Sequence, residues 1–104
     1  MSNQPDWWGY VRCMIRRHPE RKGKDLSGRE LQEYIAVQTA IEITERMADG
    51  RKRLEVIDLT LWKGTHTIAG AALLIPCSKN TAQRWRSRFI KDVAKNFRCD
   101  GLIS

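Results

Sequence analysis

Apolar residues recur at intervals of three and four along most of this chain, a spacing that predicts α-helices rather than strands. The first helix is predicted over residues 6–18, with Asp6 as its N-cap and an end before Pro19, because proline disfavours the helical conformation of the preceding residue. The adjacent Trp7 and Trp8 cannot share one line of its buried face. One is expected in the core and the other at a partner contact. The further apolar residues of this face are Val11, Met14 and Ile15.

A linker and an acidic helix follow. Residues 19–26 are polar and basic and are predicted to form a surface linker. One long helix is predicted over residues 27–49, since Ser27 and Glu30 have the spacing of a capping box and Asp49 and Gly50 are typical of a helix end. The apolar side expected for this helix is Leu31, Tyr34, Ile35, Ile41 and Met47. Its acidic residues are Glu30, Glu33, Glu42 and Glu45.

A third helix is predicted over residues 51–62 and is expected to end at Gly64. Its stripe consists of Leu54, Ile57 and Leu61, widened by Val56 and Leu59. Three basic residues open it, although the backbone dipole favours acids at a helix N-terminus by about 0.3–1 kcal/mol. These residues, Arg51, Lys52 and Arg53, are therefore candidates for contacts to phosphate groups.

Two further helices are predicted to meet across about three residues. Thr67 is the expected N-cap of a short helix that Pro76 ends, and Ser78 is expected to cap the next by accepting from the backbone N–H of Asn80 or Thr81. The inward residues of the short helix are Ala71, Ala72 and Ile75. Small residues where two helix axes approach, with a short turn between, are typical of a helix-turn-helix unit.

The last helix has two chemically different faces when residues are placed at about 100° intervals. One face is predicted to pack inward and consists of Ala82, Trp85, Phe89, Ile90, Val93 and Phe97. The opposite face is rich in amide and guanidinium groups, which make paired hydrogen bonds to adenine and guanine in the major groove. Arg86 falls on the apolar face, and it is expected either to reach a phosphate or to pair with Glu55 or Asp58.

Taken together, the pattern predicts an all-α fold: a small bundle of four to five helices in a single domain, residues 1–104. Residues 51–97 would form the helix-turn-helix region, with a recognition helix over about 78–97. The residues predicted to contact DNA are Lys79, Asn80, Thr81, Gln83, Arg84, Ser87, Arg88 and Lys91. Further candidate phosphate contacts, besides the basic residues at 51–53, are Lys63 and Thr65.

Composition supports a polyanionic partner. The 104 residues carry a net charge of +7, and residues 79–104 hold seven basic against two acidic groups. A hydrophobic content of 41% is that of a globular protein, and no apolar run approaches the roughly 18 residues of a membrane span. A cytoplasmic protein without a membrane partner is therefore expected.

Enzymatic activity is not expected, because the chain has no G-x-S-x-G or P-loop motif and its Ser, His and acidic residues show no catalytic spacing. The three cysteines, Cys13, Cys77 and Cys99, lack the spacing of a zinc site and are expected to be buried free thiols. No cofactor, metal or small-molecule substrate is predicted.

Two stretches, WWGYVRCMIRRHPE near the N-terminus and TLWKGTHTIAGAALLIPCSKNTAQRWRSRFIKDVAKNF near the C-terminus, resemble the RinA/ArpU family of phage transcriptional regulators. The resemblance covers about residues 7–97. It implies an activator of phage late genes with a C-terminal helix-turn-helix similar to the promoter-binding region of sigma factors. It also implies that the entry to the motif is formed by Trp62, Lys63, Thr65, His66 and Thr67. The residues that it assigns to the recognition helix are Thr81, Gln83, Arg84 and Trp85. Pro76 and Cys77 depart from the usual turn pattern of such motifs.

Three functions remain open at this point. The leading one is a sequence-specific transcriptional regulator that binds double-stranded DNA. A second is a packaging protein similar to a phage terminase small subunit, for which a ring of many subunits is expected. The third is a protein-interaction module whose acidic helix, Gly28 to Ala48, contacts RNA polymerase or pairs two copies of the chain in a homodimer.

Overall fold

The computed structural model describes residues 7–97, and over that range the regular elements are all helices, joined by short turns. The elements are α1 (Trp8–Arg21), α2 (Gly28–Glu45), α3 (Gly50–Ile57), a π-helical turn η1 (Asp58–Trp62), α4 (Ile68–Leu74) and α5 (Lys79–Phe97). The prediction of an all-α bundle of four to five helices is confirmed. None of the helices within 7–97 is long and apolar enough to cross a membrane. Asp6 and Cys99 lie outside the described residues.

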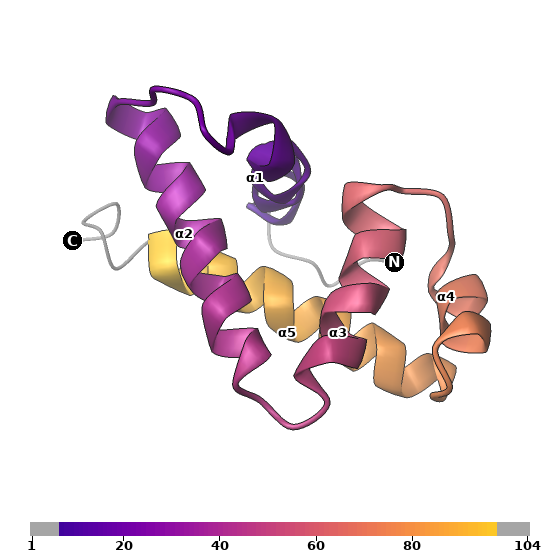
Figure 1. Ribbon diagram of the computed structural model, residues 1–104. Helices are drawn as coiled ribbons and strands as arrows, with labels where there is room; N and C mark the ends of the chain where they lie inside the picture. The colour runs from indigo at the N-terminus through magenta and orange to yellow at the C-terminus, as the bar shows by residue number, and fades with distance from the viewer. Residues whose placement is uncertain (1–6, 98–104) are drawn as a thin grey trace.

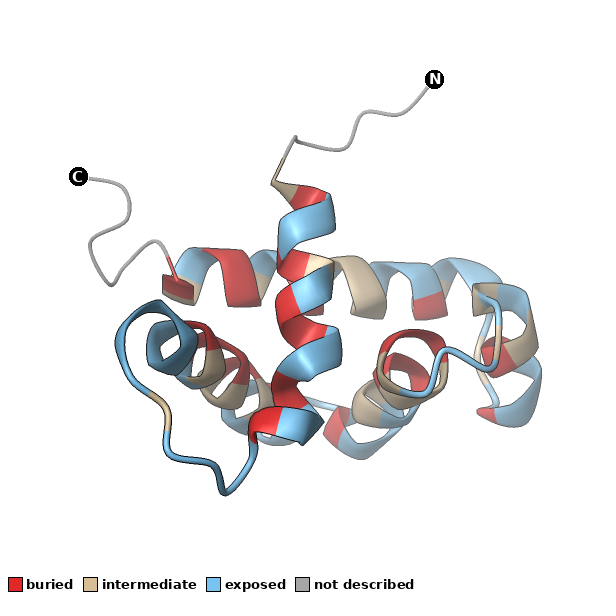
Figure 2. Cartoon of the chain, turned by 90° about the horizontal axis from the view of Figure 1, so that it is seen from above, coloured by how far each residue is buried: buried red, intermediate tan, exposed pale blue. Residues whose placement is uncertain are grey.

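The helix α5 runs along one side of the bundle, and α2 and α3 cross over it (Figure 1). The short α4 lies at the edge, beside α3 and the first turns of α5. Seen from above, α1 crosses over α5, with its N-terminal turns extending beyond it (Figure 2). The main core lies between α1, α2, α3 and α5 and includes Val37, Ile57, Phe89 and Ile90. A second, smaller core lies beneath α4.

The prediction that the first helix ends before Pro19 is wrong, because α1 continues through Pro19 to Arg21. Proline has no N–H, so the carbonyl of Ile15, four residues earlier, loses its intrahelical donor. The indole Nε1–H of Trp62 donates to that carbonyl at 2.7 Å and replaces the missing bond. The connection to α2 is therefore shorter than the predicted linker and comprises residues 22–27.

Of the two adjacent tryptophans, one lies in the core, as expected. Trp8 is buried in the main core, whereas Trp7 is half-buried and packs against that core from outside. The two rings lie 5.6 Å apart between centroids. The cysteine prediction is wrong for Cys13, which is exposed on α1, and Cys77 is half-buried. Burial of Trp8 and exposure of Cys13 follow from which side of α1 meets the other helices.

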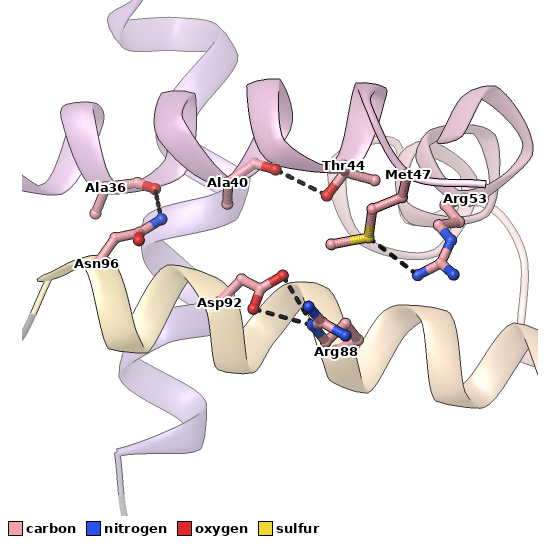
Figure 3. Close-up of polar contacts among 8 residues, drawn as sticks. All are labelled: Ala36, Ala40, Thr44, Met47, Arg53, Arg88, Asp92 and Asn96. Carbon is pink, nitrogen blue, oxygen red and sulfur yellow. Dashed lines mark hydrogen bonds and ion pairs between the residues drawn. The ribbon is translucent and has the colours of Figure 1, made fainter. Parts of the chain in front are cut away.

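The buried face of α2 matches the predicted one only in part: Tyr34 and Ile41 are half-buried, and Ile41 packs against the main core. Leu31 and Ile35 are 39% and 45% exposed. The residues that α2 buries are Glu33, Ala36, Val37, Ala40 and Thr44. Small side chains let α2 lie directly against α5, where the Asn96 side-chain amide donates to the Ala36 carbonyl at 3.2 Å (Figure 3). Close approach of the two helices thus selects the alanine side of α2.

The one acid on this buried face is fully paired. Glu33 accepts from the guanidinium of Arg21 at 2.7 Å through one carboxylate oxygen and from the hydroxyl of Tyr10 through the other. Burial, followed by the bond to Glu33, raises the pKa of the Tyr10 hydroxyl. Since both partners belong to α1, this network fixes α1 against α2.

His18 makes a second polar contact between α1 and α2. It is buried, its Nε2 lies 3.0 Å from the side-chain oxygen of Gln38, and its ring stacks on Tyr34 with 4.6 Å between centroids. Burial lowers the pKa of this imidazole. The imidazole therefore belongs to the interior contact between the two helices.

The start of α2 agrees with the prediction and its end does not. Ser27 is the N-cap residue, but it makes no side-chain cap bond, so the predicted capping box is not formed; Gly28, the first helical residue, has a positive φ of 60°. At the other end the helix stops at Glu45. Asp49 takes the left-handed conformation, and Gly50 already begins α3. A Cβ at Gly50 would lie 2.4 Å from the carbonyl oxygen of Thr44, so glycine is needed there for close approach.

Candidate nucleic-acid interface

The short helix α4 begins where the sequence predicts. The hydroxyl of Thr67 accepts from the backbone N–H of Gly70 at 3.0 Å and caps the helix. Ala71, Ala72 and Ile75, the residues expected to point inward, are all buried. The chain reaches Thr67 through Gly64, whose φ of 64° reverses its direction after η1. The backbone before α4 is thus set by a glycine turn and a threonine cap.

A four-residue turn, 75–78, joins α4 to α5. Ile75 leaves the helical conformation, as expected for the residue before Pro76, and its side chain fills the second core with Ala72, Ala82 and Val56. Alanines from both helices meet in this core, which permits the helices to lie close together. A large aliphatic residue therefore anchors the turn from the position before the proline.

The start of α5 is capped by Ser78, as predicted. Its hydroxyl oxygen accepts from the backbone N–H of Thr81 at 3.0 Å and donates to the Thr81 hydroxyl at 2.8 Å. The N–H groups of Lys79 and Asn80 come before the first intrahelical bond of α5, which runs from the Ala82 N–H to the Ser78 carbonyl at 3.0 Å, and both residues are exposed. Such an end favours anions, because its unpaired donors and the helix dipole act together. Lys79, the first residue of α5, adds a positive charge there.

The two faces of α5 separate as the sequence predicts. The inward residues Ala82, Phe89, Ile90, Val93 and Phe97 are buried, and Trp85 is half-buried. On the opposite face Lys79, Asn80, Gln83, Arg84, Arg88 and Lys91 are exposed, while Thr81 and Ser87 are half-buried. Most of these polar residues line one shared, open surface together with Ser78. Apart from a 3.5 Å contact from Arg84 to the Thr81 hydroxyl, the amides and guanidinium near the helix start are not held by the described chain.

One of the predicted DNA-contacting residues already has an internal partner. The Nε–H of Arg88 lies 3.1 and 3.2 Å from the two carboxylate oxygens of Asp92, one helical turn later (Figure 3). Asp92 was not among the residues predicted from the sequence, although an acid four residues after an arginine is a signal for such a pair. The positive potential of this face is therefore concentrated at Lys79, Arg84 and Lys91.

The candidate phosphate contacts at the start of α3 divide into two groups. Arg51 and Lys52 are exposed. Arg53 instead donates to the carbonyl of Ala48 at 2.9 Å, and its guanidinium lies 5.6 Å from the ring centroid of Trp85. A basic residue at this helix start therefore has an internal role: it satisfies a carbonyl in the preceding turn and covers an aromatic ring.

The remaining two candidates lie between η1 and α4 and are both exposed. Lys63 forms an ion pair with Asp58 at 3.3 Å, and the hydroxyl of Thr65 lies 2.9 Å from Nδ1 of His66. Surface pairs of this kind contribute little to stability and are easily exchanged for another partner. The structure thus places Lys63 near an acid that partly neutralises it.

Arg86 does not pair with Glu55 or Asp58, so that expectation is wrong. Its Nε is buried and has no hydrogen-bond partner within residues 7–97. Burial lowers the pKa of its guanidinium, and the charges of Arg12 and Arg16 on α1 lower it further. Neither of these two arginines was among the candidates predicted from the sequence. Their spacing of four residues, which places both on one side of a helix, was the available signal.

Comparisons with known proteins found no match, since no protein-family model, curated protein or solved structure is similar enough to this chain to be assigned. Function is therefore inferred from the chain's own geometry. In the part of the chain that the structure describes, no three His, Cys, Asp or Glu residues are grouped so that they could hold a metal ion.

Proposed function

We propose that this protein is a sequence-specific transcriptional regulator that inserts α5 into the major groove of double-stranded DNA. The observation that carries the proposal is the division of α5: its aromatic side is anchored in the core while Asn80, Gln83 and Arg84, near its N-terminal end, remain exposed. In helix-turn-helix proteins the N-terminal residues of the second helix contact the bases. In this proposal α4, the turn and α5 form such a unit.

The exposed side chains supply the chemistry that base recognition needs. Asn80 and Gln83 carry amides that can donate to N7 or accept from N6 of adenine, and Arg84 can donate two hydrogen bonds to guanine. Ser87, one turn further, can contact either a base or the backbone. Because the opposite side of α5 packs against two cores, these side chains are presented on a fixed helix axis.

Affinity would come mainly from phosphate contacts. Lys79 and the open start of α5 suit one phosphate, and Lys91 suits another. Arg51 and Lys52, exposed at the start of α3, are further candidates. Each phosphate neutralised releases counterions, so binding should weaken steeply as salt rises. Arg88, Lys63 and Thr65 would first have to give up the internal partners described above.

The test uses duplexes selected from a random library by the purified protein, compared with duplexes of random sequence. Arg84→Ala should weaken binding to selected duplexes by about 1–3 kcal/mol and leave random duplexes almost unaffected, because its bonds are to bases. Lys91→Ala should weaken both equally. Lys24→Ala, in the connection between α1 and α2, is the control and should change neither. Equal losses on both kinds of duplex for Arg84→Ala would exclude Arg84 from base recognition.

The resemblance to the RinA/ArpU regulators extends the proposal to a cytoplasmic activator of phage or prophage late genes that contacts RNA polymerase. Its support is only the resemblance of the residue pattern around Trp62 to Trp85. Reporter transcription from a promoter that contains the selected sequence tests activation. A rise with the wild-type protein supports an activator, and a fall indicates a repressor.

An interaction role has one observation in its favour. Leu31, Ile35 and Ile43 on α2 are 39–45% exposed on an otherwise acidic helix. Exposed aliphatic residues of this kind suit a protein partner, either a second copy or the polymerase. Size-exclusion chromatography with light scattering separates a monomer from a dimer, and a ring of many subunits would favour the terminase-like alternative instead.

A further inference from the structure

Every fourth residue from Arg84 to Asn96 belongs to one row along α5, and each step of this row turns by about 40° around the helix axis. The row begins on the open face, where Arg84 and Arg88 are exposed. It continues through the half-buried Asp92 and ends where the Asn96 amide donates to the Ala36 carbonyl of α2 (Figure 3). Arg88 therefore lies at the border between the open face of α5 and the side that packs on α2.

Asp92 holds only one part of the Arg88 guanidinium. Its two carboxylate oxygens lie 3.1 and 3.2 Å from Nε, whereas the terminal nitrogens Nη1 and Nη2 have no hydrogen-bond partner within residues 7–97. The side chain of Asp92 is 15% exposed and that of Arg88 is 59% exposed. The better buried carboxylate therefore restrains the longer, more exposed arginine. The result is a guanidinium that is oriented at Nε and has two unpaired donors at its outer end.

Helix stability does not account for this ion pair. Pairs four residues apart stabilise a helix better when the acid comes first, and here the arginine comes first. Ion pairs at exposed positions also contribute little to stability. In addition, the carboxylate of Asp92 reduces the positive charge of a surface that is proposed to bind DNA. The pair therefore lowers the attraction of phosphates to this face and adds little to the stability of α5.

A neutral pair of this kind suits an uncharged acceptor better than a phosphate. A phosphate at Nη1 and Nη2 would be attracted by Arg88 and repelled by Asp92, so the two charges largely cancel. The guanine edge in the major groove instead presents two uncharged acceptors, O6 and N7, which match two donors of one arginine. Such a contact leaves the bond from Nε to Asp92 intact. A restrained arginine also loses less side-chain freedom when it binds.

We propose that Asp92 is a positioning residue that holds Arg88 so that its Nη1 and Nη2 donate to O6 and N7 of a guanine in the major groove. The inference rests on the proposed function and names one base that the site recognises. Arg88 lines the same open surface as Arg84, Ser87 and Lys91, one helical turn beyond Arg84. Asp92 acts on base recognition only through Arg88 and does not itself contact DNA.

The experiment measures base preference at each position of the duplexes that the wild type selects, for Arg88→Lys and Asp92→Asn. Arg88→Lys keeps the charge but loses the paired donors, so it should lower the preference for guanine at one base pair by roughly 5- to 150-fold. Asp92→Asn should lower the preference at the same base pair by about twofold or more, because a neutral amide restrains the guanidinium less firmly. Its affinity for random duplexes should rise, since a negative charge is removed.

Two controls separate positioning from a change of charge or of fold. Glu55→Gln removes a negative charge from an exposed position on α3, and it should keep the wild-type base preference at every position. The double variant Arg88→Lys with Asp92→Asn should lose no more preference for guanine than Arg88→Lys alone, because Asp92 acts through Arg88. Thermal unfolding followed by circular dichroism should give nearly the wild-type melting temperature for each variant.

Wild-type preference at every base pair for Arg88→Lys would overturn this inference. So would an Asp92→Asn protein that keeps the preference for guanine where Arg88→Lys loses it. Equal losses on selected and random duplexes would indicate a phosphate contact and would also contradict it. In these cases the proposed function still stands if Arg84→Ala weakens binding to selected duplexes more than to random ones. A wild type that does not distinguish selected from random duplexes would overturn both.

Discussion

The helices α2 and α5, with 18 and 19 residues, are the two longest within residues 7–97 and pack against each other. The side chains that they bury differ in size and polarity. α5 buries large residues such as Phe89 and Ile90, whereas α2 buries alanines, a valine and two polar residues. At their contact, α5 contributes the large side chains and α2 contributes a surface of mostly small ones. The largest apolar residues of a helix therefore need not lie on its buried face when the neighbouring helix already fills the core.

The largest expected effect tests that difference directly. Phe89→Ala should lower the free energy of unfolding by about 3–5 kcal/mol, because it removes a fully buried ring and leaves a cavity. Ile35→Ala on α2 should change it by less than about 0.5 kcal/mol, since that side chain is 45% exposed. Urea denaturation of the two variants measures both. Comparable losses would mean that α2 is covered in solution by a partner, such as a second copy.

A smaller effect on the free energy of unfolding is expected from a larger side chain on the face of α2 that contacts α5. Ala40→Leu should cost about 1–3 kcal/mol, because Ala40 is fully buried and added methylenes would push α5 away. Gln32→Leu, at an exposed position on the same helix, is the control. Thermal unfolding followed by circular dichroism checks the pair. An Ala40→Leu protein as stable as the control would show that α2 and α5 do not need their close approach.

The smallest effect concerns the polar contacts that hold α2 to α1. Because burial lowers the pKa of His18 below 6.5, the unfolded chain takes up this proton first as pH falls. Stability from this group is complete above about pH 6.5 and declines as pH falls below it. His18→Gln should remove this part of the pH dependence. The measurement is the free energy of unfolding of both proteins at pH values from about 7.5 to about 5, the range in which histidine titrates. An unchanged difference across that range would contradict it.

The candidate site followed from the sequence more fully than the bundle did. The caps at Thr67 and Ser78, the stop at Pro76 and the two faces of α5 are local features, set by hydrogen bonds and periodicity within a few residues. Which side chains of that face already have partners was harder to predict. Asp92 is only one turn from Arg88, but the contact of Arg53 with Trp85 joins residues 32 positions apart in the chain.

By itself, the sequence determined that the chain is helical, where α4 and α5 begin, and which side of α5 faces inward, since each depends on spacing within one or two helical turns. Tertiary structure alone decided that α1 continues through Pro19, that α2 buries its alanines, and that the Nε atoms of Arg12 and Arg86 are buried without a hydrogen-bond partner within residues 7–97. In each of these cases the deciding contact comes from a distant part of the chain. The Trp62 indole compensates for the proline, and the approach of α5 chooses the face of α2.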